Sequence, residues 1–210
     1  MPIYNQTQKK IVAMALHLFL AQGIKRTTIE DVADSCGVTR ATVYRYFKDK
    51  KNLVYVSLIH LVNLLDEALA DIGNQNDYSA EKSAERIKEA VNVLPRGKLN
   101  VRLDELKQLY PDIFIEYQKA RLASIQKLYK SVFNRLKRDK LVLPSETDLN
   151  LLLSILSETT LYVAESPLVM AHGVSVVDIY TAILDIMLYG IVGRGKKIKP
   201  DRKPVNELVY

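Results

Sequence analysis

The chain has 210 residues, of which 48% are hydrophobic and 26% are charged, so it can bury a sizeable core. Apolar residues recur at helical spacing and do not alternate as they would in strands, which predicts an all-α fold. The single cysteine, Cys36, cannot form an internal disulfide. These features exclude a disulfide-stabilised secreted domain and predict a cytoplasmic protein without a cofactor or metal.

The net charge of +6 is concentrated at the two ends of the chain. Residues 1–55 hold nine Lys or Arg against four acids, and residues 193–210 hold six against two, whereas the part between is slightly acidic. A basic N-terminal domain on a mildly acidic body suits a protein that contacts phosphates at one end. Because a charge run can equally be a solvated face, charge alone leaves both interpretations open.

The first third of the chain predicts three short helices and a long one. Apolar residues three and four apart predict the first helix at about 7–22. Thr27 and Thr28 each have an acid three residues later, so either can cap the second helix. A third helix is expected at about 39–47, and a long fourth at about 49–73 connects these helices to the rest of the chain.

The remaining sequence predicts further helices, separated by proline, glycine and capping residues. One is expected from Ser79 to Pro95, a short one ends before Pro111, and a long one spans about 112–140. Ser145 and Ser175 each precede an acid by three residues and are expected to open two final helices.

Residues 27–47 have the pattern of a helix-turn-helix. Two short helices cross closely when the first has a small residue, the turn has a glycine and the second has a β-branched residue. Ala33, Gly37 and Val43 occupy these three positions. The pattern predicts that this segment is a steeply crossed helix pair.

The second helix of this pair is expected to expose Arg40, Thr42 and Arg45. A short helix with such a face can enter a major groove, where Arg bonds guanine edges and Thr meets a thymine methyl group or a phosphate. The alternative is an ordinary helical hairpin with a polar surface. Because the motif coincides with the basic end of the chain, the sequence favours DNA binding.

The segment from Ile11 to Leu53 resembles the tetracycline-repressor (TetR-like) family. The matching stretches are Ile11-Val12-Ala13-Met14-Ala15, Leu18-Phe19, Gly23, Thr27-Thr28-Ile29, Asp31-Val32-Ala33, Cys36-Gly37-Val38-Thr39, Val43-Tyr44, Tyr46-Phe47 and Lys48-Asp49-Lys50-Lys51-Asn52-Leu53. The departures are Ala41 in place of a frequent Gly, Cys36 in place of Ala, Lys51 in place of a common acid, and the added charge of Arg45. After residue 55 only the helical layout is similar to the family.

The resemblance implies a DNA-binding protein with a palindromic operator as its target. It implies that the DNA contacts are made by Thr28, Thr39, Arg40, Ala41, Thr42, Tyr44, Arg45, Tyr46 and Lys50, of which Thr28 and Lys50 are expected to contact phosphates. For the two tyrosines, packing in the core remains an alternative. The expected domains are a helix-turn-helix domain at 1–52, a helical effector-binding and dimerisation domain at 53–192, and a basic tail at 193–210.

The resemblance also implies a homodimer, a small-molecule effector among the central helices and, usually, repression. Aromatic and charged residues on these helices are the candidates for the effector pocket: Arg102, Tyr110, Phe114, Tyr117, Arg121, Tyr162 and His172. The two last helices are apolar on more than one stripe, so part of that surface needs a partner. The expected dimer interface consists of Leu149, Leu152, Leu153, Leu156, Tyr180, Ile183, Leu184, Met187, Leu188 and Ile191.

Other functional classes fit the sequence less well. The stretch Gly190–Lys196 matches a phosphate-binding loop only in part, because Lys197 stands where Ser or Thr is needed, and no catalytic motif is present, so we expect no enzyme. The apolar run 11–21 is too short to span a membrane and lacks a signal-peptide cleavage site. The alternative that stays open is a helical scaffolding protein whose basic end binds nucleic acid without sequence preference.

Overall fold

The computed structural model describes residues 4–70, 99–138, 146–166 and 182–183, and in these ranges it is all-helical. The principal helices are α1 (Gln6–Gln22), α2 (Ile29–Cys36), α3 (Arg40–Phe47), α4 (Lys50–Ala70), α6 (Leu99–Leu109), α7 (Pro111–Arg138) and α8 (Glu146–Glu165). The predicted all-α class is confirmed, and these helices lie close to their expected positions. The helix expected from Ser79 and the basic tail fall outside the described residues, and of the last helix expected from Ser175 the structure describes residues 182 and 183.

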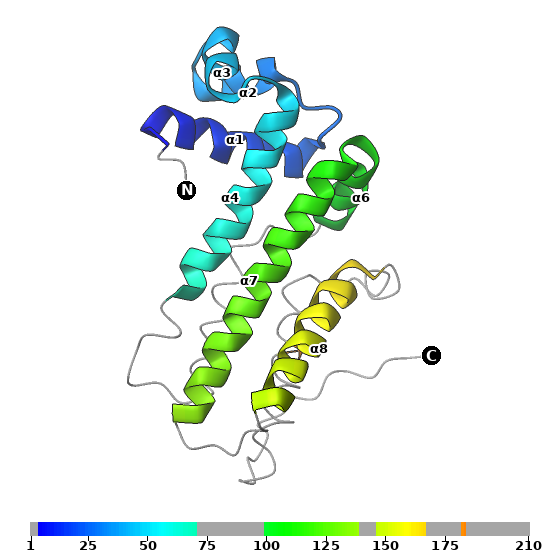
Figure 1. Cartoon of the computed structure of the whole chain (residues 1–210). Coiled ribbons are helices and arrows are strands. Elements are labelled where there is room, and N and C mark those ends of the chain that lie inside the picture. The colour runs from blue at the N-terminus through cyan, green and yellow to red at the C-terminus, as the bar shows by residue number, and fades with distance from the viewer. Residues whose placement is uncertain (1–3, 71–98, 139–145, 167–181, 184–210) are drawn as a thin grey trace, which may run out of the picture.

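The helices form a small unit of α1–α3 at one end, and α4 runs from that unit into the larger helical part (Figure 1). The long helix α7 lies along α4 on one side and along α8 on the other, while α6 lies beside α1 (Figure 1). Buried apolar side chains form one cluster that continues from α1 through α4 to α7. The three-helix unit is therefore joined to the rest by a shared core as well as by the chain.

The structure decides which of the two threonines caps α2. Thr28 is the cap, because its hydroxyl accepts from the backbone N–H of Asp31 at 3.1 Å and the Asp31 carboxylate accepts from the Thr28 N–H at 2.7 Å. Thr27 is fully buried, and its hydroxyl lies 2.8 Å from the Gly23 carbonyl oxygen. The local pattern could not separate the two residues, since only the packing of α1 places one of them inside.

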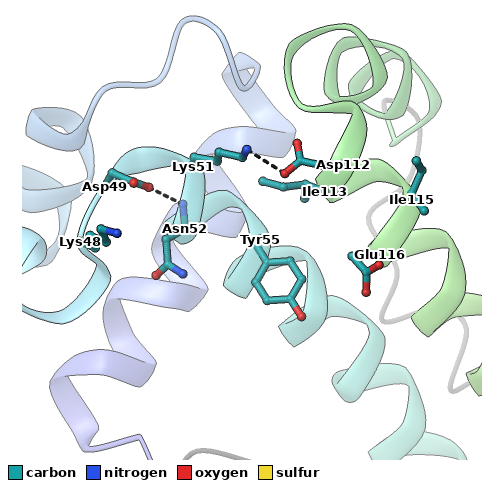
Figure 2. Close-up of a pocket in the computed structure, with 9 residues that line it drawn as sticks. All are labelled: Lys48, Asp49, Lys51, Asn52, Tyr55, Asp112, Ile113, Ile115 and Glu116. Atoms are coloured by element: carbon teal, nitrogen blue, oxygen red, sulfur yellow. Dashed lines mark hydrogen bonds and ion pairs between the residues drawn. The ribbon is translucent and has the colours of Figure 1, made fainter.

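Helix α7 contacts the start of α4 through an exposed ion pair. The Lys51 ammonium lies 2.7 Å from the Asp112 carboxylate, which holds the pKa of that carboxyl below its ordinary value. The pair crosses an open groove of about 470 Å³ (Figure 2). The groove is lined by Lys48, Asp49, Lys51, Asn52, Tyr55, Asp112, Ile113, Ile115 and Glu116. Its charges are mixed, so it does not extend the basic surface.

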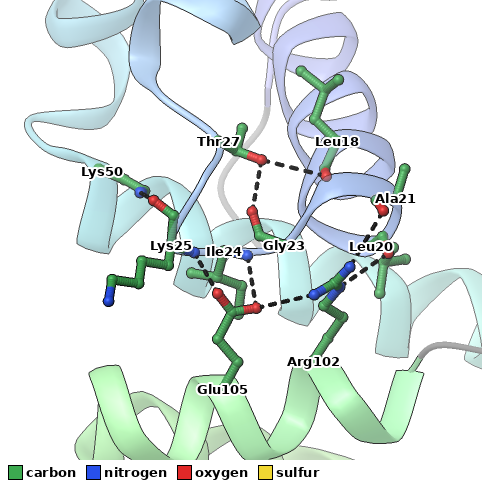
Figure 3. Close-up of polar contacts among 10 residues, drawn as sticks. All are labelled: Leu18, Leu20, Ala21, Gly23, Ile24, Lys25, Thr27, Lys50, Arg102 and Glu105. Carbon is green, nitrogen blue, oxygen red and sulfur yellow. Dashed lines mark hydrogen bonds and ion pairs between the residues drawn. The ribbon is translucent and has the colours of Figure 1, made fainter.

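Helix α6 holds the turn between α1 and α2 with two side chains, Arg102 and Glu105, which we call the α6 clamp (Figure 3). The two carboxylate oxygens of Glu105 accept from the backbone N–H groups of Ile24 and Lys25 at 3.0 and 2.6 Å. Arg102 donates to the carbonyl oxygens at residues 20 and 21, each at 3.2 Å. The last carbonyls of a helix lack partners within it, so the clamp satisfies the end of α1 from outside.

The clamp also explains why glycine stands at position 23. Gly23 has φ 108° and ψ 151°, and an added Cβ would lie 2.8 Å from Nη1 of Arg102 and 3.1 Å from Oε2 of Glu105. Gly37, the other glycine with positive φ in the described residues, has φ 66° and open space around the Cβ position. The first glycine is therefore required by its backbone conformation and by the clamp, and the second by its conformation alone.

We predict that Gly23→Ala destabilises the protein more than Gly37→Ala. The left-handed conformation of Gly37 costs an alanine about 1 kcal/mol. The conformation of Gly23 costs about 1–3 kcal/mol by itself, and displacing Arg102 adds the loss of its hydrogen bonds. Urea unfolding of both variants measures the difference. Equal losses would show that the clamp moves aside freely in solution.

Candidate nucleic-acid interface

Helices α2 and α3 form the predicted crossed pair. Ala33 is 2% exposed and Val43 is fully buried, so the small and the β-branched residues both lie in the core. Gly37 adopts the left-handed conformation expected of the turn, and the N–H of Val38 donates to the Ala33 carbonyl at 3.0 Å. The helix-turn-helix geometry expected from the sequence is present.

Helix α3 is anchored to the protein by two side chains on one side. Val43 and Phe47 are buried, and Thr39 caps the helix by accepting from the N–H of Thr42 at 3.2 Å. The other side chains form what we call the recognition face: Thr39, Arg40, Ala41, Tyr44 and Arg45, which are exposed, and Thr42, which is half-buried. One side of α3 is thus fixed in the core, and the other presents cations and hydroxyl groups.

The two tyrosines of α3 differ in their surroundings. Tyr44 is 39% exposed, so the core-packing alternative does not apply to it. Tyr46 is half-buried against Phe47, with ring centroids 6.3 Å apart, and the Arg45 guanidinium lies 5.1 Å from its ring centroid. Hydrogen bonds from Asn5 and Arg45 lower the pKa of the Tyr46 hydroxyl. The Tyr46 ring therefore packs against Phe47, while its hydroxyl group lies at the surface.

Arg40, at the start of α3, is held by two neighbours. Its Nη1 lies 2.6 Å from the Glu30 carboxylate on α2, and its guanidinium lies 5.4 Å from the Tyr44 ring centroid. The Tyr44 hydroxyl and Glu30 together raise the pKa of the Arg40 guanidinium. Sequence analysis did not single out Glu30, because its contact with Arg40 depends on the crossing of α2 and α3.

Two predicted phosphate contacts lie at the edge of this surface. Thr28 is exposed, and its hydroxyl is used in capping α2. Lys50 is half-buried, and its ammonium donates to the backbone carbonyl of Lys25 at 3.3 Å (Figure 3). Burial lowers the pKa of the Lys50 ammonium. Lys50 therefore lies against the turn that the α6 clamp holds, and its ammonium has further N–H groups with which it can bind a phosphate.

The N-terminal helices match known proteins in sequence. Residues 11–55 match the family model described as bacterial regulatory proteins, tetR family. The chain is 42% identical over 49 residues to the HTH-type transcriptional regulator AcrR of Shigella flexneri, a match that covers 23% of each protein. The N-terminal helices of this chain are similar to those of TetR-family regulators. Because the match spans less than a quarter of AcrR, it concerns the DNA-binding helices alone.

The overall fold is similar to those of solved structures. A TetR transcriptional regulator from Legionella pneumophila superposes with a TM-score of 0.61 at 20% identity, covering 91% of this chain and all of that one. A protein named SmeT, solved as a complex with triclosan, gives a TM-score of 0.60 at 18% identity, covering 97% of this chain and all of that one. At such identities the likeness shows the fold. It confirms an N-terminal helix-turn-helix unit followed by a helical C-terminal part.

The residues predicted to line an effector pocket are spread over several places. Tyr117 and Arg121 are buried on α7, whereas Tyr110 and Phe114 are half-buried near its start. Arg102 belongs to the α6 clamp, and Tyr162 on α8 is 82% exposed in the single chain. His172 lies outside the described residues. Tyr117 and Arg121 are therefore the predicted pocket residues that lie buried on the same helix.

Further buried polar groups, outside the set predicted for the effector pocket, lie along the same helices. The hydroxyl groups of Tyr129 and Thr160 are 2.5 Å apart and join α7 to α8. Ser124 donates to Asp66, which joins α7 to α4. Hydroxyl groups in helices give little pattern in a sequence, so only the packed arrangement identifies them.

The leucines predicted for the dimer interface are partly used inside the chain. Leu152, Leu153 and Leu156 are half-buried against the core, and Ile183 is 9% exposed. The large apolar side chains that α8 exposes are Leu151, Ile155 and Tyr162, at 62%, 52% and 82%. Leu149 lies on α8, and the positions outside the described residues are Tyr180, Leu184, Met187, Leu188 and Ile191.

The described helices include none that is long and apolar enough to cross a membrane. The named relatives found by sequence are transcriptional regulators, a class that generally does not carry catalytic activity. What the chain shares with these relatives is the sequence of its N-terminal helices.

Proposed function

We propose that this protein is a sequence-specific repressor that a small molecule releases from a palindromic operator. The observation that carries the proposal is the recognition face, on a helix that Val43 and Phe47 fix to the core. Helix α3 has eight residues, so it is about 12 Å long and fits the width of a major groove. The residues expected to contact DNA are those implied by the family resemblance, with Arg40 and Lys50 in different roles.

We predict that Arg40→Ala weakens binding to the operator selectively. A guanidinium bonded to guanine contributes about 1–3 kcal/mol of discrimination, so the variant should lose that much on the operator and little on random DNA. Lys50→Ala serves as the contrast, because a phosphate contact carries no sequence information. It should weaken both complexes and reduce the salt slope by about one. Fluorescence anisotropy at several salt concentrations measures both effects.

The same titrations separate the regulator from the scaffolding alternative. A regulator favours its operator over random DNA by a factor of about 10³ or more. Binding that is tight but equal on both DNAs would favour a scaffolding protein. If Arg40→Ala lowers the affinity for operator and for random DNA equally, Arg40 contacts the phosphate backbone and not a base.

We further propose a homodimer that α8 helps to form, with the last helix of the sequence as its second element. The support is the exposed apolar stripe of Leu151, Ile155 and Tyr162, because a monomer in water gains nothing from exposing it. A two-fold dimer presents two copies of α3, which must lie about 34–36 Å apart to enter successive major grooves. The palindromic operator follows from that symmetry.

We predict that Leu151→Glu with Ile155→Glu converts the dimer into a monomer. Two carboxylates at a buried interface cost far more than the exposed apolar side chains they replace. The matched control is Asn150→Glu with Ser154→Glu, which adds the same charge at exposed positions of α8. Sedimentation at micromolar concentration distinguishes them. A monomeric wild-type protein would contradict the dimer, and a dimeric Leu151/Ile155 variant would place the interface elsewhere.

We propose that ligand binding is transmitted to the DNA-binding helices through the α6 clamp as well as through α4. The effector-binding part is expected at 53–192, with Tyr117 and Arg121 of α7 as candidates for its buried polar groups. Helices α6 and α7 meet at Tyr110, whose N–H donates to Leu106 and whose carbonyl accepts from Phe114. A ligand that shifts α7 would therefore also shift Arg102 and Glu105 against the α1–α2 turn. The triclosan complex of SmeT supports a ligand-binding role for this fold.

We predict that ligand and operator weaken each other's binding by the same factor. A preference of about 1–3 kcal/mol for the released form corresponds to a 5- to 150-fold loss. The measurement is calorimetric titration, with and without operator, of any compound that raises the melting temperature of the protein. Glu105→Ala should reduce the factor toward one while leaving ligand affinity intact, and Asp104→Ala, an exposed acid on the same helix, should not. Equal ligand affinities with and without operator in the wild type would contradict the proposed release.

A further inference from the structure

Asn5 lies directly before α1 and donates a hydrogen bond to the hydroxyl group of Tyr46 on α3. Its Nδ2 is 3.4 Å from Oη of Tyr46, which lies 41 residues further along the chain. The other end of the same amide is fixed, because Oδ1 accepts from the backbone N–H of Gln8 at 2.9 Å and the Gln8 side chain accepts from the Asn5 N–H at 2.9 Å. This capping box identifies the amide group beside Tyr46 as the NH2 group, which can only donate.

The Tyr46 hydroxyl therefore accepts hydrogen bonds and keeps its own proton for another acceptor. Arg45, which also hydrogen-bonds to this hydroxyl, is a donor only, and the two donors together lower the pKa of the phenol, with Asn5 contributing most. A phenol oxygen accepts on its lone pairs and donates through its single proton. Accepting a hydrogen bond also polarises the O–H bond and makes the hydroxyl a better donor. These surroundings suit a partner that only accepts.

The position of Tyr46 on α3 indicates which partner this is. Since successive residues of a helix are about 100° apart, Tyr46 lies about 240° around the helix axis from Arg40. The centre of the recognition face, with the exposed Ala41 and Arg45, lies between these two flanks. When the centre of a short helix faces base edges in a major groove, its flanks face the two backbone strands that border the groove. Phosphate oxygens on those strands only accept hydrogen bonds, whereas base edges offer both donors and acceptors.

We propose that Asn5 is a positioning residue for a phosphate contact made by Tyr46. Asn5 keeps the phenol oxygen as an acceptor and so directs the phenol proton to a phosphate of the DNA. The inference rests on the proposed DNA binding and extends it, because it adds a residue outside the matched segment 11–55 and assigns Tyr46 to the DNA backbone. One exposed hydrogen bond changes an equilibrium constant about two- to five-fold, which sets the size of the effect.

The test reverses this hydrogen bond with Asn5→Asp and compares that variant with Gln6→Glu. Aspartate caps a helix as well as asparagine does, but its carboxylate accepts the phenol proton. Gln6→Glu adds the same charge at the next exposed residue and leaves Asn5 in place. Asn5→Asp should weaken binding to random DNA about two- to five-fold more than Gln6→Glu does. An operator selected from a random duplex pool should lose affinity by the same factor, because a phosphate contact carries no sequence information.

The variant Tyr46→Phe shows whether the effect passes through the hydroxyl. In this background the difference between Asn5→Asp and Gln6→Glu should disappear, because no phenol proton is left to redirect. Fluorescence anisotropy measures the affinities, and urea unfolding of each variant checks that the fold is kept.

The pKa of Tyr46 is a second readout, which needs no DNA. In protein labelled with carbon-13 at Cζ of tyrosine, the signal that Tyr46→Phe removes identifies Tyr46. Its pH titration should give a higher pKa in Asn5→Asp than in Gln6→Glu, because a carboxylate that accepts the proton stabilises the neutral phenol. A role of Asn5 in capping α1 alone would not produce this difference.

Two results would overturn the proposal. If Asn5→Asp and Gln6→Glu weaken DNA binding equally while Tyr46 is present, Asn5 does not act through the phenol. If the difference between them persists after Tyr46→Phe, Asn5 acts on the DNA directly. A failure of the proposed function is recognised separately, since the wild-type protein would then select no operator, while random DNA and the Tyr46 titration would still test the role of Asn5.

Discussion

A single carboxylate, that of Glu105, accepts two successive backbone N–H groups at the turn between α1 and α2. Hydrogen bonds to an ionised acceptor are stronger than neutral ones, and this acceptor belongs to a helix more than 75 residues further along the chain. The orientation of the three N-terminal helices is therefore tied to α6. Gly23 permits the approach, because any side chain there would meet Arg102 or Glu105.

The same turn connects the clamp to the DNA-binding surface. Lys50, at the start of α4, donates to the Lys25 carbonyl, and the Lys25 N–H donates to Glu105. Thr27 anchors the other side of the turn by bonding the carbonyl oxygens of Gly23 and Leu18. A displacement of α6 thus reaches a predicted phosphate contact through two hydrogen bonds, without passing along the length of α4.

Two cations of the proposed DNA-binding surface already have partners within the protein. Nine Lys or Arg in residues 1–55 provide attraction for DNA of any sequence. In the structure, however, Arg40 is paired with Glu30 and Lys50 with a backbone carbonyl. Breaking these contacts costs free energy on any DNA, so the attraction of this surface is weaker than its number of cations implies.

The sequence by itself determined the helical class, the positions of the helices described here and the helix-turn-helix. These features depend on residues near one another in the chain: caps such as Thr39, the glycine of a left-handed turn and apolar residues three and four apart. Tertiary structure alone decided that Thr28 rather than Thr27 caps α2, that Glu30 meets Arg40, that α6 holds the α1–α2 turn, and that Leu151 and Ile155 are the exposed apolar residues of α8. Each of these depends on which face of a helix is covered by an element distant in the chain. Periodicity shows that a helix has an apolar face, but it does not identify the element that covers that face.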